Sequence, residues 1–135
     1  MSSSAVLGEQ VINRAGRRCE YCRMHQALQG ATFHIEHIIP QSQGGTTESA
    51  NLALACPSCN LKKSNRQEAS EPDTGVVVPL FNPRQQIWHE HFKWEAYQMV
   101  GLSSIGRATI EAFDLNHSRR VLIRQAEERL GLFPG

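Results

Sequence analysis

Apolar residues in the first half of the chain follow short helical and strand patterns separated by polar stretches. The Ser-rich start, residues 1–8, is expected to be frayed, and the apolar spacing in 9–18 predicts a short helix. Aromatic and β-branched residues fill 31–39, which predicts a β-strand ended by the following proline. Residues 48–54 favour one helical turn, and a further helix is expected over 60–68. This half is therefore expected to combine short helical segments with one strand.

The second half follows a polar, turn-rich connection at 69–75, which is the best candidate for a domain boundary. Residues 76–80 predict a short strand, and alternating aromatic positions in 87–100 predict one or two half-buried strands. Ser103 and Asn116 each carry the side chain of a helix N-cap ahead of an apolar helical stripe. The stripe of the last helix, which we expect to face the core, consists of Leu122, Ala126 and Leu130. The pattern as a whole predicts an α+β fold that ends in two helices.

The length of 135 residues suits one domain with an accessory lobe. We divide the chain into an N-terminal arm (1–14), a core (15–70) and a small α/β extension packed on the core (71–135). No apolar run approaches the roughly 18 residues of a membrane span, and the N-terminus lacks the features of a secretory signal. The formal net charge is only +1, so no overall basic field indicates nucleic acid. Composition alone therefore predicts a soluble protein with no membrane partner.

All four cysteines stand in two Cys-x-x-Cys pairs, Cys19/Cys22 and Cys56/Cys59. Two such thiol pairs, joined by a long loop, can supply the tetrahedral sulfur ligands of a structural Zn²⁺ ion. We therefore predict one zinc ion on these four residues, in preference to a disulfide or to free buried thiols. Reduced, metal-bound thiols also favour a cytoplasmic location.

Between the two thiol pairs, a carboxylate and an imidazole are neighbours in Glu36-His37. Strand alternation places His34 and Glu36 on one face and His37 on the other. A bulge or twist near the strand end could aim Glu36 and His37 at one substrate phosphate. Two amide side chains, Asn51 and Asn60, complete the polar set. This is the one constellation in the sequence that joins imidazole, carboxylate and amide groups.

A family resemblance rests on several motifs that occur together and in order. They are Cys19-x-x-Cys22, Ile35-Glu36-His37-Ile38-Ile39-Pro40-x-Ser42-x-Gly44-Gly45, Asn51-Leu52 and Cys56-x-x-Cys59-Asn60-x-x-Lys63. This run resembles HNH endonucleases of the cysteine-containing type, and the resemblance covers residues 15–66. It implies a ββα-metal (His-Me finger) core, in which two strands and a helix surround a catalytic divalent cation. Two positions depart from the usual pattern: Asn60 replaces a histidine, and Glu36 stands where many members carry aspartate.

The chemistry of phosphodiester hydrolysis and the resemblance assign the same roles to these residues. Imidazole exchanges protons near neutral pH, so His37 is the candidate general base. Glu36 and Asn60 offer hard oxygen ligands suited to Mg²⁺ or Mn²⁺, with Ni²⁺ or another divalent cation as further options. Asn51 would hold the loop and orient His37 by hydrogen bonding. His34 is an additional candidate ligand, for which a structural role is equally open.

Basic residues beside these motifs are candidates for contact with the phosphates of double-stranded DNA. Arg17 and Arg18 precede the first thiol pair, and Lys62, Lys63 and Arg66 are expected on the outward edge of the helix over 60–68. For each group, a solvated surface without a DNA contact is the alternative interpretation.

The sequence thus predicts an HNH endonuclease that hydrolyses DNA with one catalytic cation and a histidine base. A non-catalytic zinc-ribbon module that binds nucleic acid is the chief rival interpretation. A zinc ribbon does not need the polar set around Glu36 and His37, which favours the nuclease. An inactive, nuclease-like interaction protein is the third interpretation. The sequence carries no signal for an oligomeric state.

Overall fold

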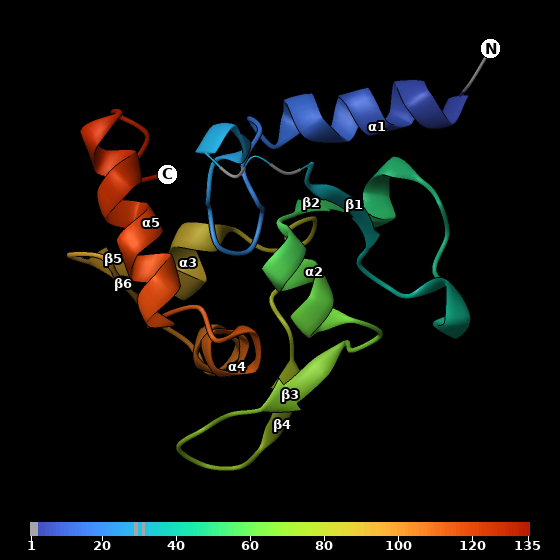
Figure 1. Cartoon of the computed structure of the whole chain (residues 1–135). Helices are drawn as coiled ribbons and strands as arrows, with labels where there is room; N and C mark the ends of the chain where they lie inside the picture. Colours follow the sequence, from blue (N-terminus) through green and yellow to red (C-terminus); the bar gives the residue numbers. More distant parts are fainter. Residues whose placement is uncertain (1–2, 29, 31) are drawn as a thin grey trace. The chain divides into compact units, whose positions relative to one another are not determined.

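A computed structural model describes residues 3–28, 30 and 32–135 (Figure 1). In these ranges the chain has a mixed α/β structure, with five α-helices and three two-stranded antiparallel sheets, so the predicted mixed class is confirmed. The chain divides into two compact units, Met1–Asn65 and Arg66–Gly135. Among the described residues, no helix combines the length and the apolar character that crossing a membrane requires.

The first unit opens with helix α1 (Ser3–Arg14), which starts well before the predicted helix over 9–18. The expectation that residues 1–8 are frayed is therefore wrong from Ser3 onward, and residues 1 and 2 lie outside the described ranges. Packing explains the longer helix, because short helices draw most of their stability from tertiary contacts. Val11 is fully buried, and the Arg14 guanidinium donates to Ser49 Oγ (2.6 Å) and to the Leu52 carbonyl (2.8 Å).

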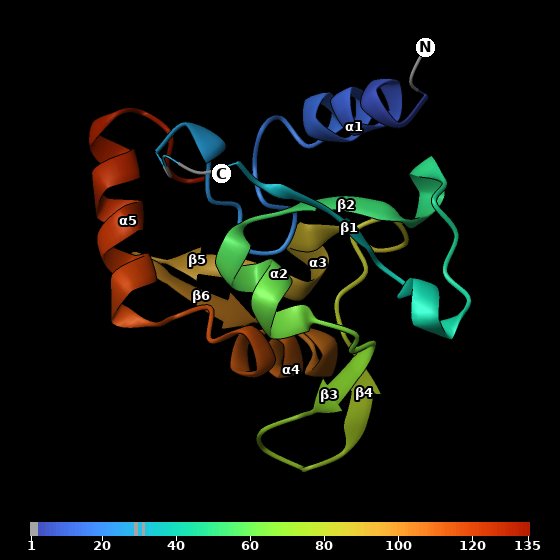
Figure 2. The same ribbon diagram turned by 45° about the vertical axis from the view of Figure 1, so that its right-hand side comes forward.

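Two antiparallel strands, β1 (His34–His37) and β2 (Leu52–Ala55), form the sheet of this unit (Figure 2). β1 is the centre of the strand predicted over 31–39, of which residue 31 lies outside the described ranges. The helical turn predicted over 48–54 is limited to Ser49–Asn51, because β2 occupies the rest. All four residues of β2 are buried, and both α1 and the following helix contact them. A short, fully buried apolar run has no periodicity that separates a strand from a helix.

Helix α2 (Pro57–Lys63) follows β2 directly, and Cys56 is its N-cap. The helix predicted over 60–68 therefore starts earlier and ends earlier than expected. Pro57 suits the first helical position, where its missing N–H removes no hydrogen bond. The chain leaves the helix at Ser64, whose φ is +49°. Arg66 consequently does not lie on the same helix as Lys62, and the predicted basic edge of Lys62, Lys63 and Arg66 does not exist.

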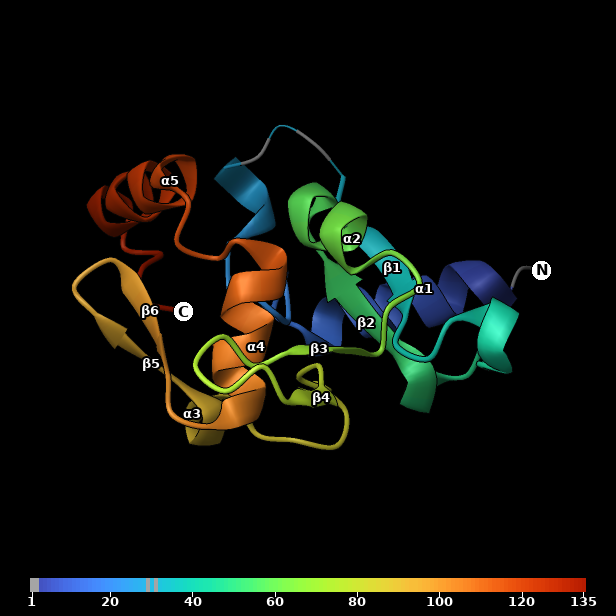
Figure 3. The ribbon, with the colours of Figure 1, turned by 90° about the horizontal axis from the view of Figure 1, so that it is seen from below.

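The second unit, Arg66–Gly135, is described throughout. Its elements are β3 (Glu68–Ser70), β4 (Val77–Pro79), α3 (Trp88–His91), β5 (Phe92–Glu95), β6 (Gln98–Gly101), α4 (Ser104–Phe113) and α5 (Ser118–Arg129). β3 pairs with β4 and β5 pairs with β6, both in antiparallel fashion. Helix α4 contacts both hairpins, through β3, β4 and β6 (Figure 3). This helix therefore forms the centre of the unit.

The β3–β4 hairpin occupies the region expected to be a connection between domains, residues 69–75. The buried Glu71 carboxylate fixes its turn by accepting hydrogen bonds from the backbone N–H groups of Asp73 and Thr74. Arg107 Nε, on α4, donates to the other Glu71 oxygen at 2.9 Å. The Arg107 guanidinium, helped by these turn hydrogen bonds, lowers the pKa of Glu71 to about 2. A charged, fully bonded carboxylate thus ties the hairpin to α4.

The aromatic segment over 87–100 was predicted as strands, and two of its three elements are strands. Its first part is instead the helical turn α3. Trp88 and Phe92 are four residues apart, and one helical turn brings their ring centroids to 5.1 Å. Residues four apart lie on one face in a strand and in a helix alike, so the alternating aromatic positions did not distinguish the two.

The two final helices are confirmed, but the N-cap of the second is wrong. Ser103 caps α4 by accepting from Gly106 N at 3.0 Å, as predicted. Asn116 is engaged elsewhere, because its side chain bonds both the N–H and the carbonyl of Met99. His117 caps α5 in its place, with Nδ1 accepting from Arg119 N at 3.0 Å.

The buried face of α5 is the opposite of the predicted one. Leu122 is 64% exposed and Leu130 62% exposed, whereas Arg120, Arg124 and Glu127 are buried. The arginines donate to backbone carbonyls of neighbouring segments: Arg120 donates to Phe113 O, and Arg124 to Tyr97 O and Leu115 O. The Arg124 guanidinium also lies 4.8 Å from the centroid of the Trp94 ring. Hydrogen bonding to the backbone therefore overrides hydrophobic periodicity in this helix.

Candidate active site and metal centre

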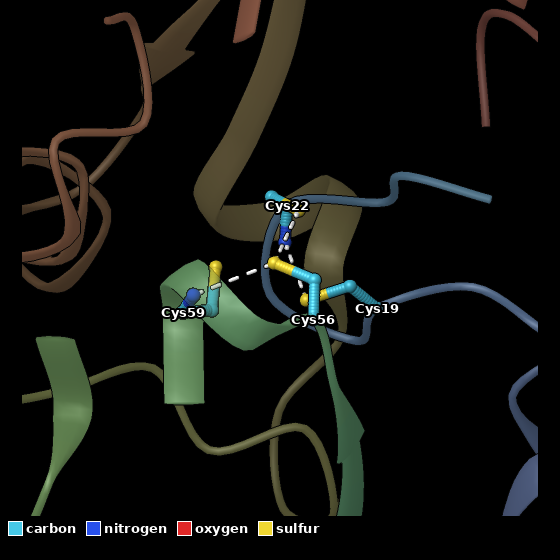
Figure 4. Close-up of side chains that lie close together, drawn as sticks. All are labelled: Cys19, Cys22, Cys56 and Cys59. Carbon is cyan, nitrogen blue, oxygen red and sulfur yellow. Dashed lines mark hydrogen bonds between the residues drawn. The ribbon is translucent and has the colours of Figure 1, made fainter. Parts of the chain in front are cut away.

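The four cysteine thiols converge at one point of the first unit (Figure 4). Cys19 and Cys22 come from the loop after α1, and Cys56 and Cys59 come from the start of α2. All four are buried and free of disulfides, and their sulfur atoms lie within 4.8 Å of one another. Among the described residues, this is the only group of three or more His, Cys, Asp or Glu side chains placed to hold a metal ion.

The spacing of the sulfur atoms fits a tetrahedral metal ion. Cys22 Sγ and Cys56 Sγ are 3.7 Å apart, and Zn–S bonds of about 2.3 Å in a tetrahedron separate the sulfurs by about 3.8 Å. In each pair a backbone N–H points at the first sulfur: Cys22 N lies 3.5 Å from Cys19 Sγ, and Cys59 N lies 3.4 Å from Cys56 Sγ. Such donors stabilise thiolates, so the four cysteines can hold a metal ion.

Burial and mutual hydrogen bonding shift the pKa values of three of the four thiols. Burial raises the pKa of Cys19 and of Cys59 well above the ordinary value of a thiol. Hydrogen bonds from the other three thiols lower the pKa of Cys56 far below it. Four thiolates buried this closely together require a bound cation.

Glu36, from β1, lies in a buried network that begins inside the first thiol pair. Tyr21, between Cys19 and Cys22, is fully buried, and its hydroxyl donates to Glu36 Oε1. Lys63 Nζ, at the end of α2, lies 3.2 Å from Glu36 Oε2. Burial raises the pKa of Glu36, and the Lys63 ammonium and the Tyr21 hydroxyl act in the opposite direction. Both carboxylate oxygens therefore have a partner.

His37 is directed to a different set of groups from Glu36. The register of β1 and β2 runs without interruption from His34 opposite Ala55 to His37 opposite Leu52. The bulge considered from the sequence is absent from this pair, so the two side chains leave opposite faces of β1. His37 Nε2 lies 2.9 Å from Thr47 Oγ1, and Gln41 Nε2 donates to the same hydroxyl at 3.2 Å. The loop after β1 therefore orients the imidazole.

The Asn51 side chain fixes the loop after β1 through hydrogen bonds to its backbone. Its Oδ1 accepts from Ile39 N at 2.8 Å, and its Nδ2 donates to Ile39 O (3.0 Å) and Thr46 O (2.9 Å). Both amide hydrogens are engaged by these carbonyls, so Asn51 does not donate to His37. Asn51 affects the imidazole indirectly: it bonds the carbonyl of Thr46, and the next residue, Thr47, carries the hydroxyl that bonds His37.

Gly45 allows this loop to close on the Asn51 side chain. A Cβ atom at this position would lie 1.7 Å from Ile39 O and 2.9 Å from Asn51 Nδ2. Both atoms belong to the hydrogen bonds that fix the loop, so neither can move without breaking them. The glycine is therefore required by close backbone approach.

Gly45→Ala is expected to break the loop and displace Thr47 from His37. We expect a loss of roughly 2–4 kcal/mol in the free energy of unfolding, typical of severe overpacking, measured by urea denaturation. Gly8→Ala is the matched control, because a Cβ there meets nothing within 4 Å. Equal stability of Gly45→Ala and Gly8→Ala would contradict the close-approach explanation.

One cleft of about 370 Å³ brings three predicted residues together. Its lining includes Glu36 and His37 from β1 and Asn60 from α2, with Gln41 and Ser42 from the loop. His34, the additional candidate ligand, is exposed and does not line this cleft. A carboxylate, an imidazole and an amide in one cleft can bind a hard cation and exchange a proton with water.

The predicted phosphate-binding residues have different environments. Lys62 and Arg17 are exposed, and Arg17 lines a second polar cleft together with His25. Arg18 donates to the carbonyl of Arg23 at 2.8 Å. Arg66, which begins the second unit, donates to the Ala112 carbonyl at 3.1 Å. Lys63 differs from all of them, because its side chain is buried against Glu36.

Sequence reasoning missed Tyr21 and Thr47 as members of the site. Tyr21 has a signal that could have been used, since an aromatic hydroxyl between two metal ligands must find a partner when it is buried. Thr47 follows the Gly-Gly turn, and only the folded loop shows that its hydroxyl meets His37. Tyr21 bonds to Glu36 and Thr47 bonds to His37, so each contacts one predicted site residue.

Residues 19–66 match the family model described as HNH endonuclease, and the resemblance carried by the motifs is confirmed for this part of the chain. The Septu protein PtuB of Bacillus thuringiensis is 23% identical over 114 residues, which are 83% of this chain and 42% of the relative. The chain thus spans less than half the length of this curated relative. No solved structure matches it.

Proposed function

We propose that the chain is a metal-dependent endonuclease that hydrolyses phosphodiester bonds of double-stranded DNA. The match of residues 19–66 to the HNH endonuclease family model supports this proposal. The observation that carries this proposal is the cleft shared by Glu36, His37 and Asn60. A zinc-ribbon binding module, the rival interpretation, has no use for an oriented imidazole that lines one cleft with a carboxylate and an amide.

In this proposal, His37 is the general base. Thr47 holds the imidazole at Nε2, and among the described residues Nδ1 has no hydrogen-bond partner. Nδ1 is therefore the nitrogen that takes a proton from the attacking water. Gln41 and Asn51 keep the imidazole in one orientation by fixing the loop that carries Thr47.

Glu36 and Asn60 would hold the catalytic divalent cation. Their donor set is a carboxylate and an amide oxygen, which suits Mg²⁺ or Mn²⁺, and Ni²⁺ is a further option. Glu36 already has one cationic partner, the Lys63 ammonium at 3.2 Å. When bound, such a cation stabilises the negative charge that develops on the leaving oxygen. We assign the four cysteines to a separate, structural Zn²⁺ ion and the protein to the cytoplasm, where thiols stay reduced.

DNA contact is assigned to cations of the first unit, of which Lys62 and Arg17 are exposed and Arg18 is half-buried. Lys62 on α2 and Arg17 and Arg18 before the first thiol pair are the candidates for binding backbone phosphates. The similarity to PtuB extends beyond residues 19–66, since it covers 83% of the chain. We therefore also propose that the chain acts in a Septu-type role.

The proposal is tested by incubating the zinc-loaded protein with supercoiled plasmid, with and without Mg²⁺, Mn²⁺ or Ni²⁺. Nicked or linear DNA should form only with a divalent cation added. The Asn60→Ala protein is expected to need a higher cation concentration for half-maximal cleavage, because the substitution removes one of the two proposed ligands. DNA binding without cleavage under every metal condition would instead support the zinc-ribbon interpretation.

A further inference from the structure

Lys63 points into the site, although its neighbours in sequence are exposed. Its side chain is at the end of α2, and the residue is only 2% exposed. Nζ lies 3.2 Å from Glu36 Oε2 and donates to the carbonyls of His37 (3.2 Å) and Ile38 (2.9 Å). The ammonium is thus surrounded by three oxygens, which are also the atoms that a hard metal cation prefers.

The electrostatics of Glu36 follow from this arrangement. One carboxylate oxygen accepts from Tyr21 and the other pairs with Lys63, so the single negative charge is already balanced by one positive charge. Glu36 is 7% exposed, and water screens charges poorly at such a buried position. A divalent cation on Glu36 would therefore experience strong repulsion from the ammonium.

We propose that Lys63 competes with the catalytic cation for Glu36 and so sets the concentration of divalent cation that the enzyme requires. The inference rests on the proposed function, because it concerns the same carboxylate. Lys63 is a positioning residue that acts through Glu36. Its hydrogen bonds to the carbonyls of His37 and Ile38, at the end of β1, keep the ammonium beside the carboxylate. This arrangement replaces the phosphate contact expected from the sequence.

The test is an equilibrium titration of zinc-loaded protein with Mn²⁺ at pH 8, without DNA, in which free Mn²⁺ is followed by electron paramagnetic resonance. Lys63→Met keeps the length of the side chain but removes its charge, and it should bind Mn²⁺ at least about tenfold more tightly than wild type. Lys63→Arg retains the charge and should stay near the wild-type affinity. Lys62→Met is the matched control, because it removes an exposed charge one residue away.

Unchanged or weaker Mn²⁺ binding by a folded Lys63→Met protein would overturn the inference. Removing the Lys63 charge leaves the buried Glu36 carboxylate without an opposite charge and can destabilise the fold. The thermal midpoint is therefore measured with and without Mn²⁺. Mn²⁺ should raise the midpoint of Lys63→Met more than that of wild type, and an equal or smaller increase would also count against competition. If neither wild type nor Lys63→Met binds Mn²⁺, the inference is overturned. The proposed function is decided separately, by whether the wild-type protein cleaves plasmid.

Discussion

His37→Ala is expected to lower the rate of plasmid cleavage by at least about a hundredfold, because a general base contributes roughly 10²–10⁴ in rate. The substitution removes the imidazole and leaves the carboxylate and the amide of the cleft in place. Only one side-chain hydrogen bond, to Thr47, is lost, and it is exposed. The free energy of unfolding should therefore change by no more than about 1 kcal/mol.

The measurement compares initial nicking rates at saturating cation, together with zinc content, thermal midpoint and DNA affinity. His89→Ala is a suitable control, since it removes an exposed histidine from the second unit, outside the HNH match. A folded His37→Ala protein that cleaves at close to the wild-type rate would remove His37 from the mechanism, and His34 would be tested next.

Cys59→Ser is expected to unfold the first unit, the largest effect on stability that we predict. Cys59 is fully buried, and its pair begins α2, the helix that carries Asn60 and Lys63. Binding of structural zinc is worth about 10–16 kcal/mol in zinc-finger peptides, and the short strands of this unit offer little core to replace it. The second unit contains no cysteine, so its own thermal transition should persist.

Zinc analysis and calorimetry of reduced protein check this prediction. Wild type should contain about one equivalent of zinc, and Cys59→Ser should lose most of it together with the thermal transition of the first unit. Ser58→Ala, in the same thiol pair, should retain both. Less than about half an equivalent of zinc in freshly purified wild type would contradict the assignment of the four thiols to a zinc site.

The sequence alone was sufficient for the features that depend on residue type and local spacing. Two Cys-x-x-Cys pairs indicate a metal site because the two-residue spacer places both thiols of each pair close enough to bind the same ion. The family of residues 19–66 followed from the ordered motifs around Glu36-His37 and Asn51. Ser103 as a helix cap and 76–80 as a strand were predictable because both are decided by neighbouring residues.

Only the tertiary structure decided which polar groups pair with each other across the chain. Lys63 resembled any surface lysine of a basic run, and its burial depends on Glu36 and on the carbonyls of His37 and Ile38. Burial of Arg124 in α5 likewise depends on the carbonyls of Tyr97 and Leu115, which no helical periodicity reveals. Periodicity reports where apolar residues lie along one element. A buried charge is stable only where distant segments supply its partners, and those partners are brought together by the fold.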